Sequence, residues 1–305
     1  MLIGAIEAGG TKMVCAVAEA DCANTAKQED NKGTCAQAKI LDRISIPTTT
    51  PKETLAEIIT YFKKWDIKAL GIGCFGPVDL NKKSSTYGYI TKTPKLEWAD
   101  CNIVGILKDA LQVPVGFDTD VNGAILGEVT WGAARDCSTA IYITIGTGVG
   151  VGVYCNGALL HGLVHPEGGH ILLRKHPEDN YKGRCPFHAT CVEGLASGPA
   201  IEERWGKKAH LLTDREEVWE MEAYYIAQAI TDYIVTYSPE KIILWGGVMH
   251  VEQLFPIVRG KVKEMLAGYV HHPMVEEQMD QYIVPPALGE DPGILGAVRL
   301  GMLEL

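Results

Sequence analysis

Four side chains of the types that bind zinc lie within 22 residues of this chain: His170, Cys185, His188 and Cys191. Two thiolates and two imidazoles can complete a tetrahedral zinc shell, and the Cys185-x-x-His188-x-x-Cys191 spacing is typical of a zinc knuckle. The alternative is chance clustering, because Cys and His are also common core residues. We predict that the segment 170–191 binds zinc.

An acidic residue stands beside the first of these ligands, in the run Glu167-Gly168-Gly169-His170. A metal-bound His170 would hold Glu167 one short turn away. It would use one ring nitrogen for zinc and keep the other for a hydrogen bond. The two signals together predict a substrate pocket braced by zinc.

The composition limits the class of protein. The 305 residues can bury a large core and are enough for two lobes, and 47% hydrophobic with 22% charged residues is typical of a soluble globular protein. No apolar run reaches about 18 residues, so no membrane span is expected. The chain opens directly on a strand-like pattern without a secretory signal, and its other cysteines show no paired spacing, which favours reduced thiols and a cytoplasmic location. The net charge of −10 argues against a nucleic-acid partner.

Two segments have the same pattern of strand, glycine-rich turn and strand. The first runs from Leu2 to Ala18 around Gly9-Gly10-Thr11-Lys12, and the second from Ala140 to Tyr154 around Gly146-Thr147-Gly148-Val149-Gly150. Glycine lets backbone N–H groups approach an anion closely, so each hairpin tip could hold phosphate oxygens. A plain glycine turn explains either tip equally well when it is considered alone.

A third signal is the sequence Asp118-Thr119-Asp120, which lies between a predicted strand at 113–117 and a predicted helix at 121–131. Open α/β sheets place their chemistry at the carboxyl ends of strands, which makes both carboxylates candidates. The alternative for Asp120 is a helix N-cap. Further strands are predicted at 39–46, 69–74 and 241–245, and further helices at 51–65, 102–111, 216–237, 255–269 and 294–302. The polar residues 21–37 are predicted to form an extended hairpin loop or surface insertion.

Four ordered motifs give this chain a resemblance to the ROK family of sugar kinases. They are Gly9-Gly10-Thr11-Lys12, Asp120-Val121-Asn122-Gly123-Ala124, Gly146 to Gly150, and Glu167 to His170. The chain departs from most members at Glu7, where aspartate is usual, and in the histidine of its Cys-x-x-His-x-x-Cys knuckle. Both departures resemble the zinc-containing bacterial fructokinase branch of the family.

The resemblance implies an α/β fold of two lobes, the actin-like or ribonuclease-H-like ATPase fold. We expect a small lobe at 1–116, with the C-terminal helix 294–305 packed back on it. The large lobe is expected at 117–293 and includes the zinc segment. The implied activity is transfer of the ATP γ-phosphate to a hexose, with fructose the first candidate, by a homodimer that uses Mg²⁺ and Zn²⁺.

The resemblance also implies roles for individual residues. Asp120 would be the general base, with Asp118 as the competing carboxylate. The sugar would be bound by Gly76, Pro77, Asn102, Glu167 and His170, although Asn102 could equally cap its helix. ATP would be bound by Gly9, Gly10, Thr11, Lys12, Thr147, Gly148, Pro199, Gly246, Gly247, Val248 and Met249. Glu7 is a candidate magnesium ligand.

Several other functions stay open at this stage. Glucose, mannose and N-acetylated hexosamines present hydroxyl patterns similar to that of fructose. The same family includes sugar-responsive regulators, which carry an additional N-terminal helix-turn-helix, whereas the kinase-like pattern here begins at Leu2. A zinc-stabilised sugar-binding protein without catalysis is the remaining alternative.

Overall fold

The computed structural model describes residues 1–20, 38–93 and 95–305. By their contacts these residues form two compact units. Unit 1 comprises Met1–Asp136, Gly157–His165 and Ala287–Leu305, and unit 2 comprises Cys137–Asn156 and Pro166–Pro286. This grouping assigns 117–136 to unit 1, whereas the sequence-based division at residue 116 assigns them to the second lobe, and that division remains a prediction. The predicted insertion at 21–37 lies outside the described residues.

Unit 1 contains a mixed five-stranded sheet. Its strands are β1 (Leu2–Ala8), β2 (Lys12–Glu19), β3 (Lys39–Pro47), β4 (Ala69–Cys74) and β5 (Val115–Thr119), in the order β3-β2-β1-β4-β5. Strands β1 and β2 form the predicted antiparallel hairpin, and β1, β4 and β5 are parallel. Side chains alternate between the two faces of β1, which is why both faces need a hydrophobic cover.

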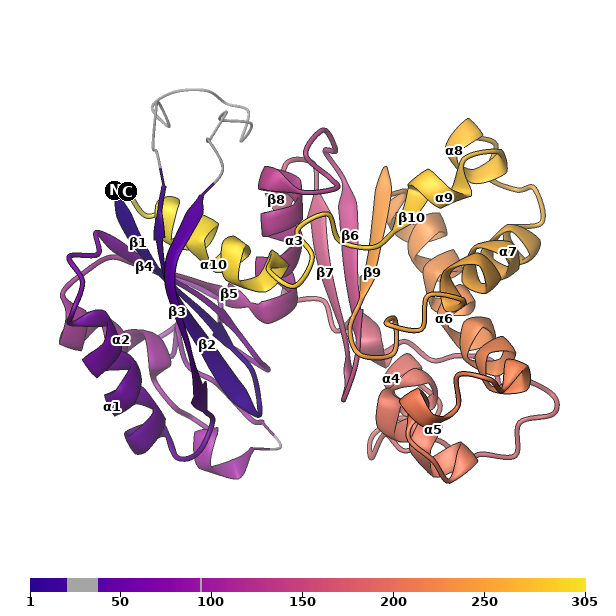
Figure 1. Cartoon of the computed structure of the whole chain (residues 1–305), viewed down its shortest axis with the longest axis horizontal. Helices are drawn as coiled ribbons and strands as arrows, with labels where there is room; N and C mark the ends of the chain where they lie inside the picture. The colour runs from indigo at the N-terminus through magenta and orange to yellow at the C-terminus, as the bar shows by residue number, and fades with distance from the viewer. Residues whose placement is uncertain (21–37, 94) are drawn as a thin grey trace. The chain divides into compact units, whose positions relative to one another are not determined.

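Helices cover both faces of this sheet (Figure 1). Ile6 and Ala8 share a core with α1 (Pro51–Phe62) and α2 (Ile103–Leu111). Ile3 and Ala5 share the opposite core with the C-terminal helix α10 (Pro292–Met302). Helix α3 (Asp120–Trp131) packs against α10. The short η1 (Leu96–Trp98) completes the described helices of unit 1.

The sheet of unit 2 begins with an antiparallel hairpin, as the sheet of unit 1 does. Strands β6 (Ala140–Ile145) and β7 (Val149–Cys155) pair antiparallel, and β6 pairs parallel with β9 (Lys241–Trp245). The strand order is β10-β9-β6-β7-β8, with the two-residue β10 (Ile283–Val284) at one end and the two-residue β8 (Ala158–Leu159) at the other. The residues of β8 are counted with unit 1 by their contacts.

The long helix α6 (Glu216–Tyr237) has the bounds predicted from its apolar spacing, and it packs against α7 (Leu254–Leu266). The remaining helices of unit 2 are η2 (Gly168–His170), α4 (Val192–Ala196), α5 (Gly198–Trp205), η3 (Ala209–Leu211), α8 (Pro273–Glu276) and α9 (Met279–Tyr282). Among the described residues, no helix combines the length and the apolar character that crossing a membrane requires.

Candidate active site

The carboxyl edge of the unit 1 sheet collects three of the predicted site segments. Ala8, Cys74 and Thr119 end β1, β4 and β5 and are partners in the ladder, Ala8 with Cys74 and Cys74 with Thr119. The turn at Gly9, the turn at Gly76 and the helix that begins at Asp120 therefore start side by side. Open α/β sheets bind ligands at this edge.

The first segment at this edge is the tight tip of the β1–β2 hairpin. The Gly9 N–H donates to the Lys12 carbonyl at 3.0 Å, and the Thr48 hydroxyl donates to the Gly9 carbonyl at 2.7 Å. A side chain on Gly9 would meet the Lys12 carbonyl oxygen at 2.8 Å, so the turn closes best with glycine. Gly10, Thr11 and Lys12 are exposed, as an anion-binding tip requires.

Glu7 stands on β1 just before this tip. Burial raises the pKa of its carboxyl, and the charges of Arg43 and Lys12 offset part of that shift. A divalent cation would favour the ionised form, so the residue fits the candidate role of a magnesium ligand.

The second segment is the junction of β5 and α3, where Asp120 is the first helical residue. Thr119 is the N-cap, because its side chain accepts from the Asn122 N–H at 3.1 Å. The alternative that Asp120 caps this helix is therefore wrong. The half-buried Asp120 carboxylate accepts from its neighbour, the Val121 N–H, at 2.9 Å. Gly73 of β4 lies beside it, since a Cβ there would be 3.4 Å from the Asp120 Cα.

Asp118, the competing carboxylate, has a different environment. It is 3% exposed, and its Oδ1 accepts from the Thr119 N–H at 2.8 Å and from the Asn122 Nδ2 at 2.7 Å. Its Oδ2 lies 2.8 Å from the His161 Nε2. Both oxygens are thus occupied inside the fold, which leaves Asp118 poorly suited to accept a substrate proton.

The third segment is the turn Gly76–Pro77, which follows β4 and contains a cis peptide bond. After it, the Val78 N–H donates to the His165 Nε2 at 3.4 Å. Short antiparallel bridges join Val78 to Ile90 and Ile90 to Cys101. These bridges link the residue after the turn, Val78, through Ile90 to Cys101, which directly precedes Asn102.

Asn102 caps α2. Its Oδ1 accepts from the Gly105 N–H at 2.8 Å, so the capping role named as the alternative is present. Its role in binding sugar stays a prediction.

Sequence reasoning missed His161 and His165. The structure places both in unit 1, His161 on Asp118 and His165 on the backbone after Pro77. The available signal was a pair of histidines four residues apart that lead directly into Glu167. The partners of these histidines could not be found from the sequence, because Asp118 is 43 residues from His161 and Val78 is 87 residues from His165 along the chain.

Three of the four segments predicted to bind ATP lie together in unit 2, and the fourth, Gly9 to Lys12, belongs to unit 1. The turn at Gly146 and the turn at Gly246 follow the adjacent parallel strands β6 and β9. The Gly198 N–H at the start of α5, next to Pro199, donates to the Gly146 carbonyl at 2.8 Å. The Val248 N–H donates to the Ile145 carbonyl at 3.0 Å. Gly246 adopts a φ of 100°, which favours glycine.

In the run Glu167 to His170, the last three residues form the short helix η2 beside β7, and Glu167 directly precedes it. A side chain on Gly169 would lie 1.9 Å from the Val149 carbonyl oxygen, which explains the glycine at this position of the motif. The Tyr233 hydroxyl of α6 donates to the Gly168 carbonyl at 2.8 Å. These contacts fix the backbone between Glu167 and His170.

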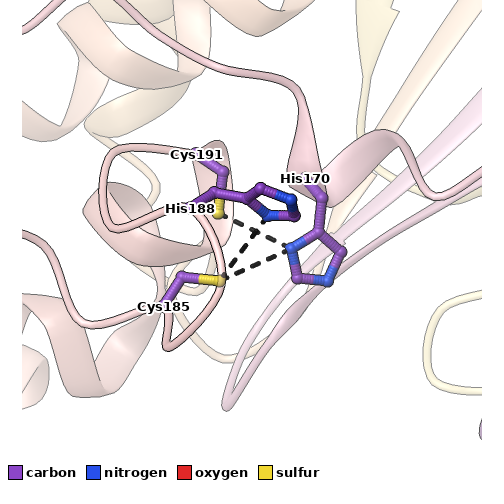
Figure 2. Close-up of side chains that lie close together, drawn as sticks. All are labelled: His170, Cys185, His188 and Cys191. Atoms are coloured by element: carbon purple, nitrogen blue, oxygen red, sulfur yellow. Dashed lines mark hydrogen bonds between the residues drawn. The ribbon is translucent and has the colours of Figure 1, made fainter.

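The four predicted zinc ligands converge (Figure 2). Their donor atoms all lie within 4.8 Å of one another. The His170 Nδ1 is 3.7 Å from the Cys185 Sγ and 3.6 Å from the Cys191 Sγ, and the His188 Nδ1 is 3.9 Å from the Cys185 Sγ. A tetrahedral zinc ion with ordinary Zn–S and Zn–N bonds separates sulfur and nitrogen by roughly 3.6 Å, so the cluster fits this metal.

The local backbone presents these ligands. The Ala189 N–H donates to the Cys185 carbonyl at 2.9 Å, which closes the knuckle, and Cys191 is the N-cap of α4, with its Sγ accepting from the Gly194 N–H. The pKa of the Cys191 thiol is raised to about 11, chiefly by burial; the Gly194 N–H lowers it and the neighbouring Cys185 thiol raises it, and both effects are included in that value. A bound cation would favour the thiolate.

Comparison with known proteins assigns the family. The model of the ROK family matches residues 3–302. The chain belongs to the ROK family. A fructokinase of Pediococcus pentosaceus is 44% identical over 305 residues, which cover 100% of this chain and 99% of that protein. A fructokinase of Streptococcus mutans is 41% identical over 309 residues, which cover 100% of this chain and 97% of that protein.

The fold of this ROK chain is also that of solved family structures. A ROK hexokinase from Thermus thermophilus superposes with a TM-score of 0.77 at 24% identity and covers 100% of this chain and 99% of that one. The predicted α/β architecture is confirmed by this likeness.

Proposed function

We propose that this chain is an ATP-dependent fructokinase that forms fructose 6-phosphate and ADP. The observation that carries the proposal is the full-length similarity to proteins named fructokinases, over a chain that retains all four ordered motifs. The Glu7 and Cys-x-x-His-x-x-Cys departures from most ROK members point to the same branch.

In the proposed reaction, Asp120 accepts the proton of the sugar hydroxyl as that oxygen attacks the γ-phosphorus. Its place at the end of β5 and its half-buried carboxylate suit this role, whereas Asp118 is engaged within the fold. Phosphoryl transfer passes through a loose transition state, so most of the acceleration comes from alignment and from screening of charge.

The remaining proposed roles are those that the resemblance to the family implies. Glu167 and His170 hold sugar hydroxyls, and Gly9 to Lys12 with Thr147 bind phosphate oxygens through backbone N–H groups and hydroxyls. Magnesium accompanies ATP and screens the phosphate charge. His170, Cys185, His188 and Cys191 would hold zinc, which would fix the His170 ring and the loop that carries it.

A coupled assay for ADP release, run with a panel of hexoses at several concentrations, tests the function. We expect the highest kcat/KM with fructose. A higher kcat/KM with glucose, mannose or an N-acetylhexosamine would support the proposed kinase activity but show that fructose is not the preferred substrate. No ADP release with any hexose, together with measurable sugar binding, would favour the non-catalytic binding protein.

The oligomeric state is a separate part of the proposal. We propose a homodimer, and light scattering on the eluting chromatographic peak should give twice the mass of the chain. A mass equal to one chain would contradict it.

A further inference from the structure

His161 belongs to a segment with an unusual position in the chain. Residues Gly157–His165 connect β7 to the Glu167 motif, and both flanking stretches belong to unit 2, yet the segment's own contacts assign it to unit 1. Its attachment includes the 2.8 Å contact between the His161 Nε2 and the Asp118 Oδ2. The His161 side chain is 42% exposed and that of Asp118 only 4%, so the pair joins the surface to the interior.

Asp118 forms hydrogen bonds with residues on both sides of the proposed base, Asp120. Through Oδ1 it accepts from the N–H of the residue before Asp120 and from the side chain of Asn122, two residues after it. The orientation of the Asp118 carboxylate therefore fixes the Thr119 N–H on one side of Asp120 and the Asn122 side chain on the other. His161 holds the other oxygen of that carboxylate and so fixes its rotation.

The pair also has an electrostatic consequence. A buried carboxylate is costly without a charged or hydrogen-bonding partner, and a second carboxylate follows two residues later. The hydrogen bond to Asp118 raises the pKa of His161, and burial opposes part of that shift. An imidazolium at this position compensates the Asp118 charge next to Asp120.

We propose that His161 is a positioning residue for phosphoryl transfer, which acts through Asp118 to fix the start of α3 and the direction of the Asp120 carboxylate. The inference rests on the proposed role of Asp120 as base. It assigns His161 no contact with the substrate. Its alternative is a purely structural link that fastens 157–165 to unit 1.

The two readings differ in which kinetic constant changes. His161→Ala should lower kcat about tenfold and leave KM for fructose and for ATP within about twofold, because the substrates are held by other groups. His161→Gln keeps an N–H donor for the Asp118 Oδ2 and should recover kcat to within about threefold of the wild type. His271→Ala is the matched control, since it removes an exposed histidine that pairs with Glu276 at 3.0 Å in unit 2, and it should leave kcat unchanged.

A double-mutant cycle separates positioning from structure. In an Asp120→Asn background, assayed with proportionally more enzyme, His161→Ala should cause no further fall in kcat, because no base remains to be positioned. A second tenfold fall in that background would indicate a structural role and overturn the proposal, as would wild-type kcat in His161→Ala. His161→Leu takes the same place in the cycle if the alanine variant fails to fold.

The same set of variants keeps the two proposals apart. If Asp120→Asn itself retains activity within tenfold of the wild type, the proposed base is wrong, and with it the positioning role. If Asp120→Asn is inactive and His161→Ala is unchanged, only the inference about His161 fails.

Discussion

Gly123 of α3 and Gly296 of α10 meet backbone to backbone. A methyl group added to Gly296 would lie 1.6 Å from the Gly123 carbonyl oxygen. The helix that begins at Asp120 is therefore seated directly on the C-terminal helix, with no side chains between them at this crossing. Any residue larger than glycine must push the two helices apart.

Gly296→Ala should lower stability by about 1–3 kcal/mol or more, because overpacking here moves backbone and not a flexible side chain. That corresponds to a fall in Tm of at least a few degrees. We also expect a lower kcat, since α3 carries Asp120. Calorimetry and initial rates on the same preparation check both effects.

Gly260→Ala is the matched control. Gly260 lies in the exposed part of α7, and nothing is within 4 Å of the position that its Cβ would occupy. Alanine has the higher helix propensity, so this variant should be stabilised by about 0.5–1 kcal/mol. A Gly296→Ala protein as stable as the control variant would show that α3 and α10 can move apart at this crossing without loss of stability, and would contradict the prediction.

Asp120→Asn should reduce kcat by at least about a thousandfold, roughly 4 kcal/mol of barrier, while calorimetric affinities for fructose and ATP stay close to those of the wild type. The amide keeps the size of the side chain but cannot accept the proton. Asp109→Asn, on the exposed side of α2, controls for loss of one negative charge and should be fully active. Turnover within tenfold of the wild type would remove Asp120 from its role.

Local pattern was enough to predict the longer strands and helices, whereas short elements such as α4 and α5 were not predicted. The alternation in β1 and β2 and the apolar spacing of α6 both predict elements that the structure contains. These features depend on neighbours within a turn or a strand, and each sequence window contains its own signal.

Side-chain partners across long stretches of chain could not be predicted in the same way. Asp118 and Asp120 are both carboxylates at the end of one predicted strand, and what separates them in the structure includes the contact of Asp118 with His161, 43 residues later in the chain. Asn102 fits both a cap and a sugar ligand because the same amide serves either role. The zinc cluster was predictable because its four ligands lie within one short segment and metal geometry restricts their spacing.

Cys185→Ser should lose bound metal and lower the stability of unit 2 by more than about 2 kcal/mol, because the remaining donors can no longer complete the shell. Elemental analysis of the wild type should give close to one zinc per chain. Cys155→Ser, which removes a half-buried free thiol of β7, is the control and should keep its metal. Wild-type protein purified without zinc would contradict the metal site.

The pair of Asp118 and His161 makes stability depend on pH in a defined direction. The pKa of His161 is raised in the folded protein above its ordinary value of 6.5, chiefly by the hydrogen bond to Asp118. The folded state therefore binds the proton more tightly than the unfolded chain. The stabilisation is complete below about pH 6.5 and is lost as the pH rises through the raised value.

The measurement is the difference in Tm between the wild type and His161→Gln, followed from pH 5.5 to 9 at low salt, because salt screens a half-exposed pair. The difference should be largest at the acidic end and shrink steadily toward the alkaline end. With Asp118→Asn in both proteins the trend should vanish, since the main cause of the raised pKa is gone. A difference that grows with pH would mean that neutral His161 is the form the fold prefers, and the charge compensation argued for Asp118 would then be wrong.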